Sequence, residues 1–210
     1  MKIEKFFDEA ARARVADAVK AAEARTSGQI VPVVVPRSRD YRSTTVEQGN
    51  TLGMLVLAAI LFTQDPGLAA LLNPLVIAAF GLLIVIQATL AARPRLLQSS
   101  EFEAAVRQRA MVAFVEHGVY RTREENGVLL FASLYERKVV VLGDRAVHEK
   151  LGDEHWNRAV ATLVAGMRAG DPAEGFCKAI ADIGEEMAKA FPRGSSSQPN
   201  EISDELRVDR

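Results

Sequence analysis

The chain has 210 residues, and 26 lysines and arginines against 27 aspartates and glutamates give it a formal net charge of -1. This length allows one medium domain or a small domain with an appendage. The balanced charge argues against nucleic acid as a partner. The single cysteine, Cys177, cannot form an intrachain disulfide, so nothing requires an oxidising compartment.

The first segment, residues 7–35, predicts a helix followed by a strand. Apolar or small residues recur every three or four positions from Phe7 to Ala22, which is typical of one face of an amphipathic helix. Gly28 follows the expected helix end, where glycine readily takes positive φ. Residues 29–35 favour a strand, but Pro32 cannot donate a ladder hydrogen bond. We expect this strand to lie at an edge or to leave that position unpaired.

Residues 43–95 predict a transmembrane helical hairpin. Two apolar runs, about 48–64 and 68–92, flank a polar break, and residues 51–92 carry one charged side chain, Asp65. At roughly 1.5 Å per residue the second run exceeds the roughly 30 Å of a bilayer core, whereas the first is short and needs local thinning or polar flanks. The alternative is a buried hairpin in a soluble domain, which long runs without a charge disfavour.

The arginines around this hairpin predict its orientation. Arg37, Arg39 and Arg42 precede it and Arg93 and Arg95 follow it, while the connecting loop has no lysine or arginine. Positive residues concentrate in cytoplasmic loops. We therefore expect a multi-pass inner-membrane protein whose soluble domain and both termini are cytoplasmic, with the lipid bilayer and a membrane protein as partners.

Downstream of the hairpin, residues 99–192 predict helices around two strands. A capping box near Ser100 begins a helix that should run to His117, and residues 128–134 and 139–142 are almost wholly apolar strands. Further helices are expected to begin near Asp153 and at Pro172. The glycine and serine residues beyond Pro192 predict a flexible tail over residues 193–210.

This order of elements predicts an α/β fold. A strand that leaves and returns through a helix normally lies parallel to the next strand, whereas the two strands joined by a tight turn must be antiparallel. We expect an α/β/α sandwich with a small mixed sheet, built from residues 1–42 and 99–192 and interrupted by the membrane hairpin.

The soluble part resembles the TPM domain family, and its bacterial membrane-embedded branch in particular. The resemblance is carried by residues 23–30, 126–130, 137–141, 152–156, 191–192 and 200–206, in this order and spacing. It implies an α/β/α sandwich. It also implies links to photosystem repair, receptor modulation, calcium binding and a modest acid phosphatase activity, with no reaction common to all members. Gln29 stands where the family often has glutamate, which removes a potential metal ligand.

Polar residues next to the two central strands form the candidate site. Glu124, Glu125 and Asn126 precede one strand and Asp144 follows its partner, so antiparallel pairing brings these ends together. Such oxygen ligands can bind calcium or magnesium, and Asn126, Asp144 and Glu125 are the predicted metal ligands. The alternative is structural: Glu124 and Glu125 lie in a solvated turn, Asn126 supplies turn geometry, and Asp144 caps a helix or pairs with a neighbouring arginine.

Two functions follow as alternatives. The preferred one is a membrane-anchored interaction or assembly module at the inner face of the membrane. The other is a weak phosphomonoester hydrolase assisted by a divalent metal. A zinc site is disfavoured, because His117, His148 and His155 do not form a ligand pair and Cys177 lies on a different helix.

Overall fold

The computed structural model describes residues 3, 6–39, 53, 78, 81, 82, 85, 99–194 and 200–209. The chain divides into two compact units, one made of Met1–Arg39 with Phe102–Arg210 and the other of Asp40–Glu101. The predicted hairpin, residues 43–95, lies almost wholly outside the described residues, and the five described there are helical. Among the described residues, no helix combines the length and the apolar character needed to cross a membrane.

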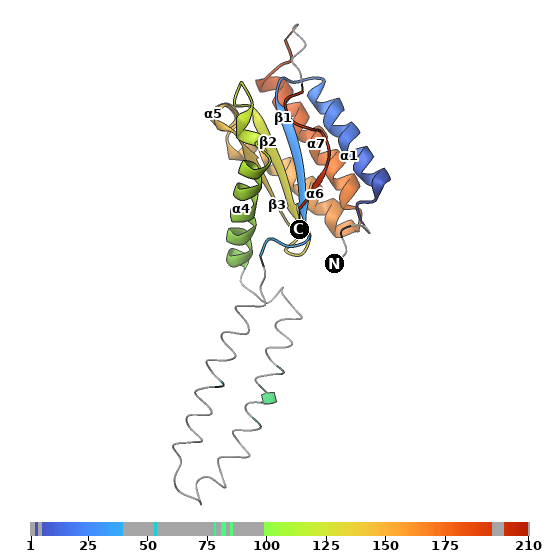
Figure 1. Cartoon of the computed structure of the whole chain (residues 1–210), viewed down its shortest axis with the longest axis vertical. Coiled ribbons are helices and arrows are strands. Elements are labelled where there is room, and N and C mark those ends of the chain that lie inside the picture. The colour runs from blue at the N-terminus through green and yellow to red at the C-terminus, as the bar shows by residue number, and fades with distance from the viewer. Residues whose placement is uncertain are drawn as a thin grey trace, which may run out of the picture. The chain divides into compact units, whose positions relative to one another are not determined.

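A four-stranded mixed sheet forms the centre of the first unit, in the order β3-β2-β1-β4 (Figure 1). β1 (Gln29–Val35) and β2 (Gly127–Ser133) run parallel along their whole lengths. β3 (Lys138–Gly143) pairs antiparallel with β2, and the short β4 (Arg207–Val208) pairs parallel with β1. The predicted mixed sheet is confirmed.

Pro32 is accommodated in β1 although this strand lies between two others. Val34 accepts a hydrogen bond from the Asp209 amide on the β4 side, and Val35 accepts one from Leu134 on the β2 side. Because successive residues of a strand point their backbone groups in opposite directions, the nitrogen of Pro32 faces the β4 side. β4 pairs only with Val33 and Val34. Pro32 therefore lies beyond the residues that pair with β4, and its missing N–H breaks no ladder hydrogen bond. The strand is not at an edge, but it leaves this position unpaired, as one of the two expectations stated.

Helices cover both faces of the sheet (Figure 1). α1 (Glu9–Glu23), α6 (Asn157–Ala169) and α7 (Pro172–Ala190) pack on one face, and α4 (Ser99–Glu116) packs on the other. Side chains alternate along β1 accordingly: Ile30 and Val34 belong to the first core, whereas Val31 and Val33 belong to the core under α4. This alternation explains why every residue of β1 and β2 is buried.

Three short elements were not predicted. α5 (Arg145–Leu151) follows β3 directly, and a 3-10 turn, η4 (Asp153–Trp156), leads into α6. The helix predicted to begin near Asp153 thus becomes a 3-10 turn before α6. A second 3-10 turn, η3 (Val119–Arg121), precedes β2. Elements of one or two turns are too short to show a hydrophobic period.

The predicted flexible tail is wrong for residues 200–209. Leu206 is buried in the larger core, and β4 extends the sheet. The Asp209 carboxylate lies 3.0 Å from Arg109 Nη2 on α4 and 3.1 Å from His117 Nε2. The run of glycine and serine predicts flexibility for its own residues alone. It carries no information about the apolar residues that follow it.

Candidate functional site

The structure brings together the strand ends at which the metal site was predicted. The Asp144 amide donates to the Gly127 carbonyl over 2.8 Å, and Val128 faces Gly143 across the ladder. The residues before β2 and after β3 therefore lie at the same end of the sheet.

Their side chains, however, point to different partners. Asn126 is buried, and its amide Nδ2 donates to Ser27 Oγ over 3.2 Å and to Glu124 Oε2 over 3.1 Å. Ser27 Oγ in turn donates to Glu124 Oε2 over 2.8 Å. This triangle ties the loop before β2 to the loop between α1 and β1. The Asn126 amide nitrogen is thus a hydrogen-bond donor here, which leaves the side-chain oxygen as the atom that could bind a metal.

Glu125 and Asp144 also have structural partners. Glu125 Oε2 lies 2.5 Å from Arg145 Nε, and Asp144 Oδ1 accepts from the Arg145 amide over 2.8 Å as the N-cap of α5. Calcium requires six to eight oxygen ligands around one point. In the described part of the chain, no three histidine, cysteine, aspartate or glutamate side chains gather in a way that could hold a metal. One side-chain atom of each predicted ligand is engaged by a protein partner, and the metal site stays a prediction.

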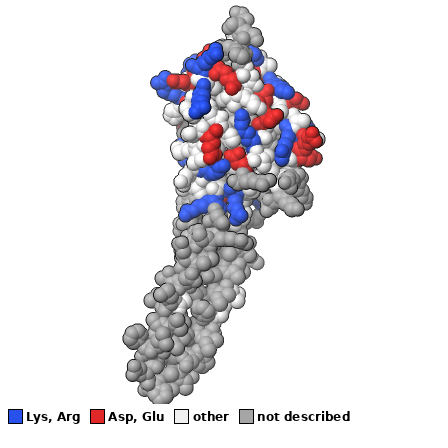
Figure 2. Space-filling view, viewed as in Figure 1, with Lys and Arg blue, Asp and Glu red and all other residues white. Residues whose placement is uncertain are grey.

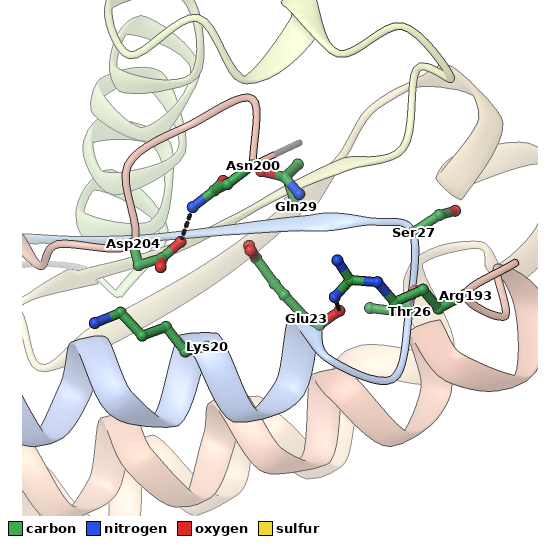
Figure 3. Close-up of a pocket in the computed structure, with 8 residues that line it drawn as sticks. All are labelled: Lys20, Glu23, Thr26, Ser27, Gln29, Arg193, Asn200 and Asp204. Atoms are coloured by element: carbon green, nitrogen blue, oxygen red, sulfur yellow. Dashed lines mark hydrogen bonds between the residues drawn. The ribbon is translucent and has the colours of Figure 1, made fainter. Parts of the chain in front are cut away.

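A different polar pocket lies beside this edge, where α1 ends and β1 begins (Figure 3). Its volume is about 150 Å³. It is lined by side chains from three parts of the chain: Lys20, Glu23, Thr26, Ser27, Gln29, Arg193, Asn200 and Asp204. The loop between α1 and β1 is fixed here by Thr26, whose hydroxyl donates to the Phe191 carbonyl over 2.6 Å at the end of α7.

Glu23 is a buried carboxyl group in this pocket, and its pKa is strongly shifted. It is the last residue of α1 and is 8% exposed, and its Oε1 accepts from the Ile30 amide over 2.7 Å. Burial, followed by the charge and hydrogen bond of the Asp204 carboxylate, raises its pKa to about 8, against the lowering effects of the Ile30 amide and of Arg193. A pKa of about 8 favours the protonated form of Glu23 at neutral pH, beside the Asp204 carboxylate.

Gln29 and Asn200 complete the link to the C-terminal segment. Gln29 Oε1 accepts from the Glu201 amide over 3.1 Å and from the Ile202 amide over 3.2 Å. Asn200 Nδ2 donates to Asp204 Oδ1 over 2.6 Å (Figure 3). The glutamine that departs from the resembled pattern thus serves as a neutral acceptor for two backbone amides.

Two cations border the pocket. Arg193 Nη1 donates to the Glu23 carbonyl over 2.9 Å, and Lys20 lies exposed one turn before Glu23 on α1 (Figure 3). A protonated carboxyl, a carboxylate and two cations can bind a small anion and move a proton at its surface. Sequence reasoning missed Glu23 and Asp204. The one available signal was a glutamate at the end of the first helix, one short loop before a strand that is buried on both faces.

The fold and this geometry can be compared with known proteins. Residues 82–186, half of the chain, match the sequence profile of the TPM domain. The chain belongs to the TPM domain family. The predicted resemblance to this family is confirmed, and its membrane-embedded branch stays a prediction.

A solved structure is similar to this TPM domain protein over its whole length. It is the NMR structure of the BA42 protein from the psychrophilic bacteria Bizionia argentinensis sp. nov., with a TM-score of 0.62 and 18% identity over 99% of each chain. At this identity the likeness shows a shared fold alone. No curated protein sequence matches the chain.

Proposed function

We propose that this TPM domain protein is a membrane-anchored interaction module that assembles with a membrane protein at the inner face of the membrane. The observation that carries the proposal is the outer face of α4. Met111, Val112 and Val115 are 51%, 43% and 61% exposed, while Val106, Ala110 and Ala113 on the opposite side of the helix are buried. A helix that is apolar on both sides buries one face in the domain and leaves the other face available to a partner.

The anchoring part of the proposal draws on the predicted hairpin. Leu82 and Val85, which belong to its second apolar run, are helical and each 61% exposed. Apolar side chains that the chain itself leaves uncovered on a helix are suited to lipid or to another membrane helix. The arginines before and after the hairpin support a cytoplasmic location for the domain.

The test combines fractionation with site-specific photo-crosslinking in cells. The full chain should stay in the membrane fraction after an alkaline carbonate wash. A photoreactive amino acid at Val115 should crosslink to one discrete membrane protein, and Met111→Lys should abolish that product. Asp17, which is exposed on α1, is the matched control position and should give no such product. Release by carbonate refutes the anchor, and identical products from both positions refute the α4 surface.

The orientation has a separate test. A reporter fused after Arg210 should be active if it works in the cytoplasm and silent if it works only outside it. Activity of an exported reporter at this position would contradict the cytoplasmic placement of the domain.

The second candidate function, phosphomonoester hydrolysis, is favoured by the Glu23 pocket. A protonated carboxyl beside Arg193 could donate a proton to a leaving oxygen while the cations bind the phosphate. The test is hydrolysis of a generic phosphomonoester by the full chain, with and without calcium or magnesium. Loss of activity in Glu23→Gln but not in Asp144→Asn would assign it to this pocket. The reverse pattern would assign it to the predicted metal edge, and inactivity of the wild-type chain would refute the hydrolase.

A further inference from the structure

A groove of about 550 Å³ runs along the free edge of the sheet, between α4 and α6. Its floor is apolar and comes from three elements: Val106 on α4, Val139 and Val140 on β3, and Val160 and Val164 on α6. Because α4 and α6 belong to opposite faces of the sheet, the groove is open where the next strand of the sheet would lie. This groove is separate from the Glu23 pocket and from the exposed residues Met111, Val112 and Val115.

The edge of β3 presents unpaired backbone groups to this groove. The Asp144 amide points toward β2, since it donates to the Gly127 carbonyl. Backbone direction alternates along a strand, so Val139 and Val141 point their N–H and C=O groups away from β2, and Val139 of these two lines the groove. β3 ends the sheet, and no hydrogen bond within the described part of the chain reaches these groups. An exposed row of this kind is a template for an added strand.

Arginines line the rim of the groove. Arg107 comes from α4, Arg137 from the turn before β3, and Arg168 from α6. Lys138 is neutralised by Glu103, whose Oε1 lies 2.5 Å from its Nζ. None of the three arginines has an ion-pair partner among the described residues. The visible face of the domain otherwise mixes both signs of charge (Figure 2), so an excess of positive charge around one groove favours an acidic ligand.

Arg137 has a backbone conformation that its own side chain disfavours. Its φ is 51°, in the left-handed region that glycine occupies without penalty. Fold stability alone would favour glycine at this turn position. The side chain at this position lines the groove.

We infer that this groove binds an extended acidic segment of a partner protein, which adds to the sheet as a strand beside β3. The backbone of the segment pairs with Val139 and Val141, its alternate apolar side chains enter the floor, and its carboxylates face the arginines. The inference rests on the proposed interaction role but uses a different surface. Absence of the Val115 crosslink would not contradict this inference, because Val115 does not line the groove.

The test is binding of labelled heptapeptides to the full chain in a non-ionic detergent. The probe alternates glutamate with valine, and fluorescence anisotropy should show binding that weakens as salt is raised. Methylating the amides of one alternate set should abolish binding, whereas methylating the other set should change it less than threefold, because only one edge of an added strand meets β3. A matched peptide of lysine and valine should not bind.

Protein variants separate this role from a structural one. Arg137→Gly should weaken binding at least fivefold while leaving the melting temperature unchanged or higher, since it relieves the strained backbone. Arg168→Gln should also weaken binding, and Arg123→Gln, an exposed arginine beyond the groove, should not. Equal effects of both methylation sets, or no binding of the acidic probe, would overturn the inference. So would binding of anionic phosphatidylglycerol vesicles through the same arginines without binding of the peptide.

Discussion

Replacing Glu23 with glutamine should remove most of the pH dependence of stability between pH 4.5 and 8. Glu23 is buried and its pKa is raised from 4.5 to about 8, mainly by burial and then by Asp204. The folded state therefore holds a proton that the unfolded chain releases above pH 4.5. The stability linked to this proton is fully present below pH 4.5 and is lost as the pH rises through 8.

The magnitude follows from the width of this window. Each pH unit within it changes the free energy of unfolding by about 1.4 kcal/mol, so the loss across the window amounts at most to on the order of 5 kcal/mol. That is a large part of the typical stability of a domain. A glutamine at position 23 keeps an oxygen for the Ile30 amide and supplies an N–H for Asp204, as the protonated glutamate does. Glu23→Gln should therefore exceed the wild type in stability at pH 8.

Trp156 provides the assay. It is the single tryptophan and is 4% exposed, so its fluorescence reports unfolding of the domain. Urea unfolding of the full chain in a non-ionic detergent, measured at intervals from pH 5 to pH 8.5, gives the free energy for each variant. Glu149→Gln, which alters an exposed glutamate on α5, is the control and should follow the wild type. Parallel curves for the wild type and Glu23→Gln would refute the proton linkage.

Three further substitutions test the packing and the caps by the same unfolding assay. Gly166→Ala should lower the free energy of unfolding by about 1–3 kcal/mol, the range typical of overpacking, because its Cβ would lie 2.6 Å from Gly175 Cα and would force α6 and α7 apart. A loss below about 0.5 kcal/mol would contradict this contact. Asp171→Ala should cost about 1 kcal/mol, since the aspartate caps α7; an unchanged value would mean that the cap contributes nothing. Arg145→Gln should leave the free energy of unfolding nearly unchanged in spite of the close pairing with Glu125, because the arginine side chain is 72% exposed and its charge is screened.

The central layers could be predicted from the sequence because their signals are local. The strands now seen as β1 and β2 are continuous apolar runs, which is typical of strands covered on both faces. The tight turn between β2 and β3 permits antiparallel pairing alone. α1, α6 and α7 carry a 3.6-residue period of apolar residues, whereas α4 is apolar on both sides. These patterns are sufficient for a mixed sheet with helices on both sides.

The C-terminal strand and the polar pocket could not be predicted in this way. β4 has two residues, and its pairing depends on the distant edge of β1. Glu23 and Asp204 come from opposite ends of the first unit, and each resembles a solvated charge when taken alone. The predicted metal ligands show the converse: their strand ends do meet, but the direction of each side chain could not be predicted, and Asn126 donates its amide protons to Ser27 and Glu124. Backbone adjacency follows from strand order, whereas side-chain direction does not.

The Glu23 pocket links the pH dependence of stability to one segment of the fold. Asp204 and the acceptor contacts of Gln29 hold residues 200–206 on the domain, and β4 follows directly. Ionisation of Glu23 places two carboxylates together in a buried site, so repulsion acts first on the segment that carries Asp204. β4 pairs through only two residues, and its further attachments are the buried Leu206 before it and the contacts of Asp209 with Arg109 and His117 after it.

Hydrogen exchange tests whether this segment opens before the whole domain. The Asp209 amide donates to the Val34 carbonyl over 3.2 Å and reports on β4, whereas the Leu130 amide lies in the centre of the sheet. After correction for the faster intrinsic exchange at high pH, protection of Asp209 should fall at least tenfold between pH 6.5 and 8.5, and that of Leu130 should fall less. Glu23→Gln should keep Asp209 protected. An equal loss at both amides would mean that Glu23 ionisation destabilises the domain as one unit, because local opening requires a difference between them.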